Sequence, residues 1–167
     1  MARSLFVLRH AKSSWDDSAL ADHERPLAPR GRRAAERIAE HLSRTHVEPE
    51  LVLCSTATRA RQTLDLVRPA LGSPKVSLED ELYGASAGGL RARLRRVPDD
   101  VETVLLVGHN PGLQDLVLEL ASAGESLDRV EAKFPTAALA TLTLDEPWSR
   151  LALRGAMLAA YVVPREL

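Results

Sequence analysis

Short apolar runs followed by polar residues divide the chain into segments. The main runs lie at 5–8, 50–55 and 103–109 and read LFVL, ELVLCS and TVLLVGH. Continuous apolar runs of this length are typical of strands that are covered on both faces of a sheet. KVSL at 75–78 predicts a shorter strand. The tail predicts two closing strands, ALATLTL at 138–144 and LRGAMLAAYVV at 153–163.

Between these strands, apolar residues recur at the three-and-four spacing of amphipathic helices. The clearest helix begins near Pro29 and places Ile38 and Leu42 on its apolar face. Further helices follow residues 50–55 and 103–109, and another is expected to begin at Ser86. Strands that alternate with helices predict an α/β fold, with a mostly parallel central sheet and helices on both faces.

Length and charge limit what the chain can be. It has 167 residues, of which 45% are hydrophobic and 27% are charged, and its net charge is −1. We therefore expect a single domain over residues 1–167. The balanced charge provides no overall positive field for nucleic acid or for an anionic membrane, so we expect neither as a partner. An anion-binding site must then be a local feature.

The N-terminal apolar run is interrupted by Arg9 and His10 before it reaches the length of a signal-peptide core. No segment approaches the ~20 apolar residues of a membrane span. We therefore expect a cytoplasmic protein, and we expect it to be a monomer. The single cysteine, Cys54, excludes an intramolecular disulfide framework and a zinc site built from several cysteines.

Chemically notable residues follow three of the predicted strands. Arg9 and His10 follow the first strand, residues 55–61 follow the second, and Gly108 and His109 end the strand at 103–109. In open parallel sheets, ligands bind beyond the carboxyl ends of the strands. We therefore expect these residues to meet at one edge of the sheet.

Four of these residues form a set that is sufficient for phosphoryl transfer. The guanidiniums of Arg9 and Arg59 can hold a phosphoryl group through forked N–H donors. The neutral imidazole of His10 is a competent nucleophile toward phosphorus. With His109 beside them, the developing charge can be neutralised without a metal or another cofactor. Taken singly, each residue also has a structural interpretation, and only their combination favours chemistry.

Two other kinds of site fit the sequence less well. A cysteine-dependent phosphatase loop has five residues between its Cys and its Arg, whereas four separate Cys54 from Arg59, so a buried core thiol is favoured. A metal site would need a ligand pattern, and the spacings of the available groups match none. Those groups are His10, Asp16, Asp17, Asp22 and His23.

The three motifs resemble those of a known family. LFVLRHAKS resembles the Arg-His signature of the histidine phosphatase, or phosphoglycerate-mutase-like, superfamily, while LCSTATRARQT and LLVGHNPG resemble its second and third motifs. RPLAPRG at 25–31 and DELYGAS at 80–86 are similar to segments of SixA-type phosphohistidine phosphatases. The similarity covers residues 5–144 in the family's order. It implies a three-layer α/β/α sandwich with a mostly parallel sheet.

The resemblance also implies a role for each matching residue. His10 is expected to be the nucleophile that becomes phosphorylated. Arg9 and Arg59 are expected to hold the phosphoryl oxygens, and His109 to donate a hydrogen bond or charge to them. Arg25 is similar to a further arginine of the SixA-type pocket.

Two positions are less clearly defined by the resemblance. Ser55 is expected either to add a hydroxyl donor or to cap the helix that follows it. Ala11 stands where many members of the superfamily have glycine, so the backbone there needs no conformation reserved for glycine.

The proton donor for the leaving group is ambiguous. Larger relatives place a glutamate a few residues before a glycine, and the matching position, four before Gly84, is Asp80, with Glu79 and Glu81 on either side. Asp80 and Glu81 are the candidate acids. SixA-type members, which this sequence resembles, lack a dedicated acid. The resemblance therefore implies a substrate with a good leaving group, such as phosphohistidine.

The sequence therefore predicts a metal-independent phosphatase that works through phospho-His10, with a phosphohistidine-bearing protein as its expected substrate. Two alternatives stay open. One is a phosphatase of small phosphate esters or nucleotides. The other is a non-catalytic module that binds phosphate or a phosphoprotein through its arginines.

Overall fold

The structure is a computed structural model that describes residues 2–167. Within these residues, seven strands form one sheet in the order β3-β2-β4-β1-β6-β7-β5. Strands β1 to β4 are parallel to one another, and β6 alone runs antiparallel to its neighbours. The strands are β1 (Arg3–Arg9), β2 (Leu51–Ser55), β3 (Lys75–Glu79), β4 (Thr103–Gly108), β5 (Ala121–Ala123), β6 (Leu139–Leu144) and β7 (Ala156–Val162).

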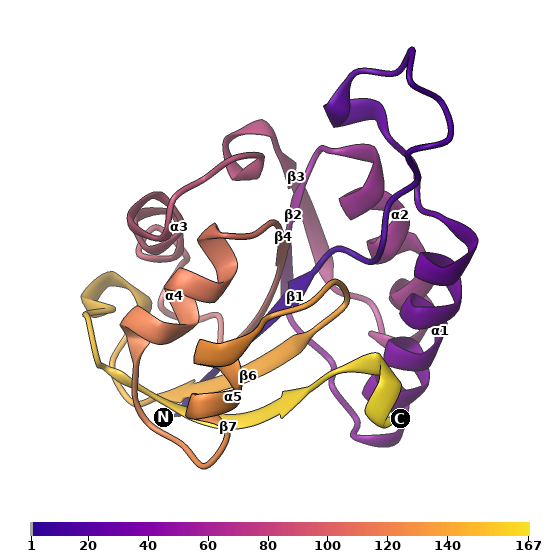
Figure 1. The fold of residues 1–167 in the computed structure, drawn as a ribbon. Helices are drawn as coiled ribbons and strands as arrows, with labels where there is room; N and C mark the ends of the chain where they lie inside the picture. Colours follow the sequence, from indigo (N-terminus) through magenta and orange to yellow (C-terminus); the bar gives the residue numbers. More distant parts are fainter. Residues whose placement is uncertain (1) are drawn as a thin grey trace.

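Helices lie on both faces of this sheet, as Figure 1 shows. One face packs against α1 (Pro29–Arg44) and α2 (Thr58–Val67), which also contact each other. The opposite face packs against α3 (Ala87–Leu94) and α4 (Gly112–Leu120), and α5 (Leu127–Ala132) contacts α4. The predicted three-layer α/β/α sandwich with a mostly parallel sheet is therefore confirmed.

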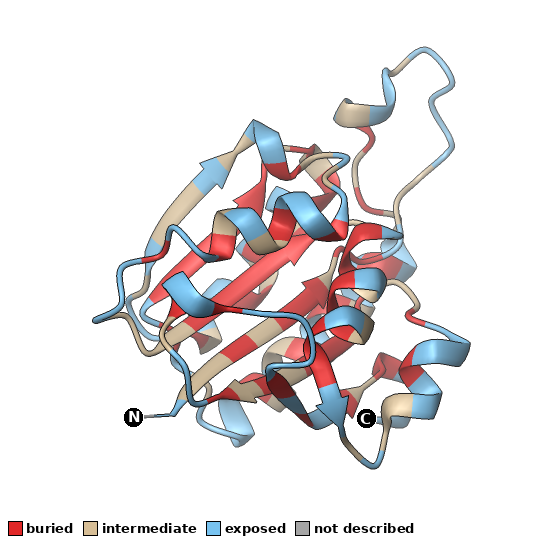
Figure 2. Ribbon diagram, turned by 90° about the vertical axis from the view of Figure 1, so that its left-hand side faces the viewer, coloured by how far each residue is buried: buried red, intermediate tan, exposed pale blue. Residues whose placement is uncertain are grey.

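The apolar runs of the inner strands are buried on both sides, as predicted. In β4, Val104 and Leu106 belong to the core under α3 and α4, whereas Leu105 and Val107 belong to the core under α1 and α2. Figure 2 shows the same pattern as buried strands between helices that are exposed on their outer sides. Alternate side chains point to opposite faces of a strand, so a sheet covered twice requires an uninterrupted apolar run.

Residues 121–132 form two short elements that the apolar pattern does not predict. Ala121–Ala123 forms the edge strand β5, parallel to β7, and Leu127–Ala132 forms the short helix α5. Three small residues carry little strand propensity, and no side chain caps the start of α5. Both elements therefore depend on packing against the rest of the molecule.

The register of the parallel strands brings their carboxyl ends together. Arg9 of β1 pairs with Gly108 of β4, and Cys54 of β2 pairs with Val107. The N–H of His10 also donates to the carbonyl oxygen of Gly108, with an N···O distance of 3.0 Å. The residues that follow β1, β2 and β4 therefore lie at one edge of the sheet.

Candidate active site

His10 is buried, and one hydrogen bond determines which of its ring nitrogens carries the proton. Its Nδ1 lies 2.7 Å from the carbonyl oxygen of Ala11. A carbonyl oxygen can only accept, so Nδ1 must be the donor in the neutral ring. The unprotonated nitrogen is then Nε2, which keeps its lone pair for attack on an electrophile.

Burial, helped by neighbouring positive charges, keeps His10 neutral. Burial, with smaller effects of the nearby His109, Arg59 and Arg9, lowers the pKa of His10 from 6.5 to about 3, against the raising effect of the Ala11 carbonyl. Protonation would place another cation among these groups at a site that water barely reaches. At neutral pH the imidazole is therefore an uncharged base with an available lone pair.

One turn of α2 fixes two segments of the site. Arg59, Gln62 and Thr63 are spaced so that they share one face of the helix. The hydroxyl of Thr63 accepts from the N–H of Ala11 at 2.9 Å, and Oε1 of Gln62 accepts from the N–H of Leu27 at 2.8 Å. The RARQT segment thus presents Arg59 and also holds the chain after His10 and the chain after Arg25.

Helix α1 holds the chain after His10 from another side. The N–H of Ala28 donates to the carbonyl oxygen of Lys12 at 2.9 Å. A Cβ atom on Gly31 would lie only 2.1 Å from that same oxygen, so the close approach of helix and chain requires glycine. This contact gives a physical reason for the glycine in RPLAPRG.

His109 follows β4 and lies beside His10, with 5.1 Å between the ring centroids. Its Nε2 is 2.7 Å from the hydroxyl of Ser55, which also accepts from the N–H of Ala57. Its Nδ1 is buried and has no hydrogen-bond partner within residues 2–167. Burial, and then the charge of Arg59, lower the pKa of His109 from 6.5 to about 4.

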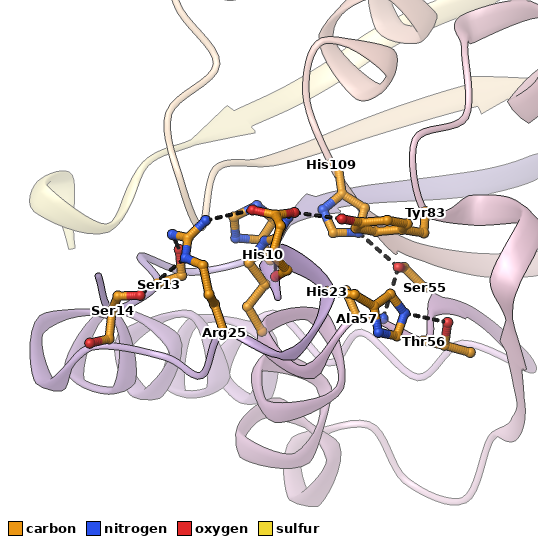
Figure 3. A network of polar contacts seen from close by, with 12 residues as sticks. His10, Ser13, Ser14, His23, Arg25, Ser55, Thr56, Ala57, Tyr83 and His109 are labelled. Atoms are coloured by element: carbon orange, nitrogen blue, oxygen red, sulfur yellow. Dashed lines mark hydrogen bonds and ion pairs between the residues drawn. The ribbon is translucent and has the colours of Figure 1, made fainter. Parts of the chain in front are cut away.

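Ser55 does not cap the following helix in the usual way. Helix α2 begins at Thr58, and its N-cap position, Ala57, has no side-chain cap. The Ser55 hydroxyl instead bridges the backbone at Ala57 and the ring of His109, as Figure 3 shows. Its contact with His109 places it among the site residues.

Asp22 connects the remaining site residues. Its carboxylate accepts from Arg59 at 3.0 Å, from Arg25 at 2.8 Å and from the hydroxyl of Tyr83 at 2.5 Å, and its backbone carbonyl accepts from Arg59 at 2.7 Å. The hydrogen bond from Tyr83, followed by those from the arginines, holds the pKa of this carboxyl well below its usual range. Asp22 is therefore ionised at any working pH.

Arg25 is buried although it lies in the segment that links β1 to α1. Its Nε donates to the carbonyl oxygen of Ser14 at 3.1 Å, and its guanidinium also bonds Ser13 (Figure 3). The guanidinium carbon of Arg25 lies 3.2 Å from the centroid of the Trp15 ring, and Trp15 is 74% exposed. Trp15 therefore covers Arg25 from the solvent side, in a cation–π contact.

The two candidate acids differ in where they lie. The carboxylate of Asp80 accepts from the hydroxyl of Thr56 at 2.5 Å, and that hydroxyl also contacts His23 at 3.0 Å. The ring of His23 packs edge-on against Tyr83, which packs against His109. Asp80 is thus joined to the site through intermediate residues.

The other acidic residues of this segment face α3. Glu81 forms an ion pair with Arg96 at 2.7 Å, and Glu79 binds Arg93 through both carboxylate oxygens. Within residues 2–167 neither forms a hydrogen bond or ion pair with His10, Arg9 or Arg59. Asp80 is therefore the carboxylate of the three that is joined most directly to the histidines.

Neither the cysteine-dependent phosphatase loop nor the metal site considered from the sequence is supported within residues 2–167. Cys54 is buried in the core under α1 and α2, and burial raises the pKa of its thiol to about 12, so it is not a nucleophile. Residues 2–167 contain no group of three His, Cys, Asp or Glu side chains placed to hold a metal ion.

Several residues of the site were given no role by the sequence. Gln62 and Thr63 belong to the LCSTATRARQT motif. Their spacing of three and four residues from Arg59 placed them on the same helix face as that arginine, and this was the signal that could have indicated them. Asp22 lies three residues before Arg25, but its contact with Arg59 crosses 37 positions. Tyr83 reaches Asp22 across 61 positions, and no local pattern indicates such a pair.

Comparison with known proteins agrees with this fold. The family model of the histidine phosphatase superfamily (branch 1) matches residues 5–137. The chain therefore belongs to the histidine phosphatase superfamily, and its fold is that of a phosphatase.

Within that superfamily the similarity extends to named relatives. The phosphohistidine phosphatase SixA of Escherichia coli (strain K12) is 34% identical over 145 residues, covering 85% of this chain and 86% of that protein. An uncharacterized protein of Mycobacterium tuberculosis (strain H37Rv) is 40% identical over 162 residues, covering 95% of this chain and 100% of the relative. A structure of the protein histidine phosphatase SixA complexed with tungstate has a TM-score of 0.80 and 29% identity, and covers 98% of both chains.

None of the helices within residues 2–167 has the length and apolar character needed to cross a membrane.

Proposed function

We propose that this protein is a metal-independent phosphohistidine phosphatase that acts on a phosphorylated protein through a phospho-His10 intermediate. One observation carries the proposal: the Ala11 carbonyl holds the proton of His10 on Nδ1, while burial and the neighbouring cations keep Nε2 unprotonated. A nucleophilic histidine requires an unprotonated ring nitrogen of this kind, and here Arg9, Arg59 and His109 lie around it.

The reaction proceeds in two balanced steps. Nε2 of His10 attacks phosphorus, a new P–N bond forms, and the P–N bond of the substrate breaks as its ring leaves with the bonding electron pair. The leaving imidazole is neutral because its other nitrogen already carries a proton. Water then attacks the phosphorus of phospho-His10: a P–O bond forms, and the P–Nε2 bond breaks with its electron pair returning to Nε2. Inorganic phosphate leaves with both protons of the water, so the neutral His10, with its proton on Nδ1, is restored.

Arg9 and Arg59 supply the positive charge that these steps need. Arg59 uses two of its five N–H donors on Asp22, which leaves three for phosphoryl oxygens. Arg9 donates to the carbonyl oxygen of Phe134 at 3.0 Å, and its buried Nε has no partner within residues 2–167. Fixed donors of this kind stabilise charge on the transferring group without having to reorganise.

His109, oriented by Ser55, adds a hydrogen-bond donor for the phosphoryl group. When the Ser55 hydroxyl donates to Nε2 of His109, the proton of that ring lies on Nδ1, the atom that has no hydrogen-bond partner among residues 2–167. Nδ1–H then donates to a phosphoryl oxygen. Arg25 acts beside it by holding Asp22 and the chain at Ser13 and Ser14.

The chemistry of the carboxylates favours a substrate with a good leaving group. Asp22 is held ionised, and Glu81 is engaged by Arg96, so neither is a ready proton donor. Asp80 would have to leave Thr56 before it could serve as one. Phosphohistidine needs no such donor, because its leaving nitrogen accepts the electron pair readily once the ring is protonated. The likeness to SixA proteins, one of which binds the phosphate-like oxyanion tungstate, supports the same substrate.

The rim of the site favours a protein over an enclosed small molecule. The segment between β1 and α1 projects from the body of the molecule (Figure 1), and residues 16–19 within it are exposed. The indole of Trp15 lies on its surface. A site bounded by one short projecting segment leaves room for a side chain presented by a larger partner.

The test compares substrates and variants in the presence of a chelator. We expect the purified enzyme to release phosphate from a phosphohistidine-bearing protein far faster than from simple phosphate esters. We expect His10→Ala to lose turnover but still bind tungstate, and Arg59→Ala to lose both. His41→Ala, which changes a histidine of α1 outside the site, is the matched control.

A trapped intermediate gives the sharper result. Rapid acid-free quenching of the wild type with labelled substrate should yield a phosphoenzyme that is labile in acid and stable in alkali, and His10→Ala should yield none. Full turnover by His10→Ala would overturn the mechanism. A preference for phosphate esters, with the same phosphoenzyme, would overturn only the choice of substrate.

A further inference from the structure

A groove of about 490 Å³ lies beside the candidate active site and is lined by cations. It runs between α1, the end of α5 and the C-terminal segment, and Figure 1 shows the C-terminus beside α1. We call it the basic groove. Its cationic residues are Lys12, Arg30, Arg33, Arg37, Arg129, Lys133 and Arg165.

Within residues 2–167, most of these cations form no ion pair. Arg129 forms an ion pair with Glu166 at 2.6 Å and packs over the ring of Tyr161. The ion pairs found within residues 2–167 include none of the other six cations. The whole chain carries a net charge of −1, so this concentration of cations is a local feature rather than a result of composition.

Helix α1 turns a basic face toward the groove. Arg30, Arg33 and Arg37 have the spacing of residues on one side of a helix, and they extend over about 10 Å of its length. The apolar residues Ile38 and Leu42 of the same helix are buried in the core. The basic face is therefore long enough to follow several residues of a bound segment.

The groove begins at the segment that carries the nucleophile. Lys12 lies two residues after His10. Thr136, also in the lining, precedes Ala137, whose N–H donates to the carbonyl oxygens of both Arg9 and His10. A partner held in the groove would therefore sit next to the chain that presents His10.

The apolar part of the lining favours a protein ligand over a nucleic acid. Tyr161, Val163 and Pro164 lie between the cations, and Pro135 lies near the site end. Protein interfaces combine aromatic and aliphatic contacts with arginines, whereas nonspecific nucleic-acid grooves rely on phosphate contacts and stacked bases. We propose that the basic groove binds an acidic segment of the phosphorylated protein substrate and so brings its phosphohistidine to His10. This rests on the proposed function.

The first experiment measures binding without any chemistry. The probe is an unphosphorylated fluorescent peptide with four glutamates, and its partner has four glutamines in their place. We expect the wild type to bind the glutamate peptide at least about tenfold more tightly, and Arg33→Gln/Arg37→Gln/Arg165→Gln to lose that preference. Arg32→Gln/Arg44→Gln/Arg150→Gln removes the same charge from exposed arginines outside the groove, and it should keep the preference.

Three binding results would overturn the proposal. They are equal binding of the two peptides by the wild type, an equal loss of preference in both triple variants, and tighter binding of a single-stranded oligonucleotide than of the glutamate peptide. Because the peptides carry no phosphate, none of these results depends on the activity of the enzyme.

The second experiment links the groove to turnover. Phosphohistidine versions of both peptides are compared with phosphoramidate, which is too small to reach the groove. We expect the groove variant to lose about tenfold in kcat/KM on the glutamate peptide and nothing on phosphoramidate. An equal loss on both substrates would overturn the docking role. If neither the wild type nor any variant cleaved phosphohistidine while the wild type kept its preference for the glutamate peptide, the proposed function would fail. Binding of acidic segments in the basic groove would remain supported.

Discussion

Asp22 accepts hydrogen bonds from Arg59 through both its backbone carbonyl, at 2.7 Å, and its carboxylate, at 3.0 Å. The negatively charged carboxylate of Asp22 is thus bonded to the guanidinium that we propose as a phosphoryl ligand. The carboxylate orients Arg59, and it also repels and competes with an incoming anion.

This relationship predicts tighter phosphate binding when the charge is removed. We expect Asp22→Asn to lower the inhibition constant for inorganic phosphate a few-fold, equivalent to about 1 kcal/mol, because the amide keeps the shape without the repulsion. Competitive inhibition assays measure the change. Asp17→Asn, on the exposed part of the same segment, is the control. An unchanged or higher inhibition constant for Asp22→Asn would show that the carboxylate acts only by positioning Arg59.

Thr63 is expected to matter through the backbone of the nucleophile segment. Thr63→Val keeps the volume but leaves the buried N–H of Ala11 without its acceptor, which costs about 1–3 kcal/mol of unfolding free energy. Because Ala11 holds the proton of His10, kcat should fall more than KM rises. Urea unfolding and steady-state kinetics measure the two effects. Thr63→Ser, which keeps the hydroxyl, should recover most of the activity, and a failure to do so would assign the effect to packing.

The buried histidines predict how stability depends on pH. The pKa of His10 is lowered from 6.5 to about 3, and that of His109 to about 4. Between pH 6.5 and 4 the unfolded chain takes up protons on these rings while the folded protein does not, so the free energy of unfolding falls as the pH falls. The slope is at most about 1.4 kcal/mol per pH unit for each ring.

Urea unfolding of the wild type and of His10→Gln across that range tests this prediction. The variant lacks one of the two rings, so its unfolding free energy should depend less steeply on pH. His46→Gln changes an exposed histidine and should match the wild type. Parallel pH profiles for the wild type and His10→Gln would mean that His10 titrates normally in the folded protein.

Removal of metal ions is expected to leave activity intact. The charge of the phosphoryl group is met by Arg9 and Arg59, and residues 2–167 offer no cluster of three metal-ligating side chains. Turnover before and after dialysis against a chelator measures the effect, and elemental analysis of the dialysed protein checks that metal is gone. A loss of activity that a divalent cation restores would return the metal site to consideration.

Much of the fold followed from local patterns. The doubly buried strands required uninterrupted apolar runs, α1 showed its apolar stripe beside charged residues, and Ser86 caps α3 by accepting from the N–H of Gly89 at 3.1 Å. Each of these signals lies within one element, so the sequence alone predicts them. The elements that it did not predict, β5 and α5, are short, and packing rather than propensity maintains them.

The site divides in the same way. The sequence by itself determined that His10, Ser55 and His109 lie at or just after the carboxyl ends of parallel strands and therefore meet at one edge. The motifs indicated Arg9, Arg59 and Arg25. Only the tertiary structure decided which nitrogen of His10 is free, that Asp22 joins Arg59 to Tyr83, and that α1 faces α5 across a basic groove. These features depend on atoms brought together from distant positions, where burial and charge act through space and leave no periodic pattern along the chain.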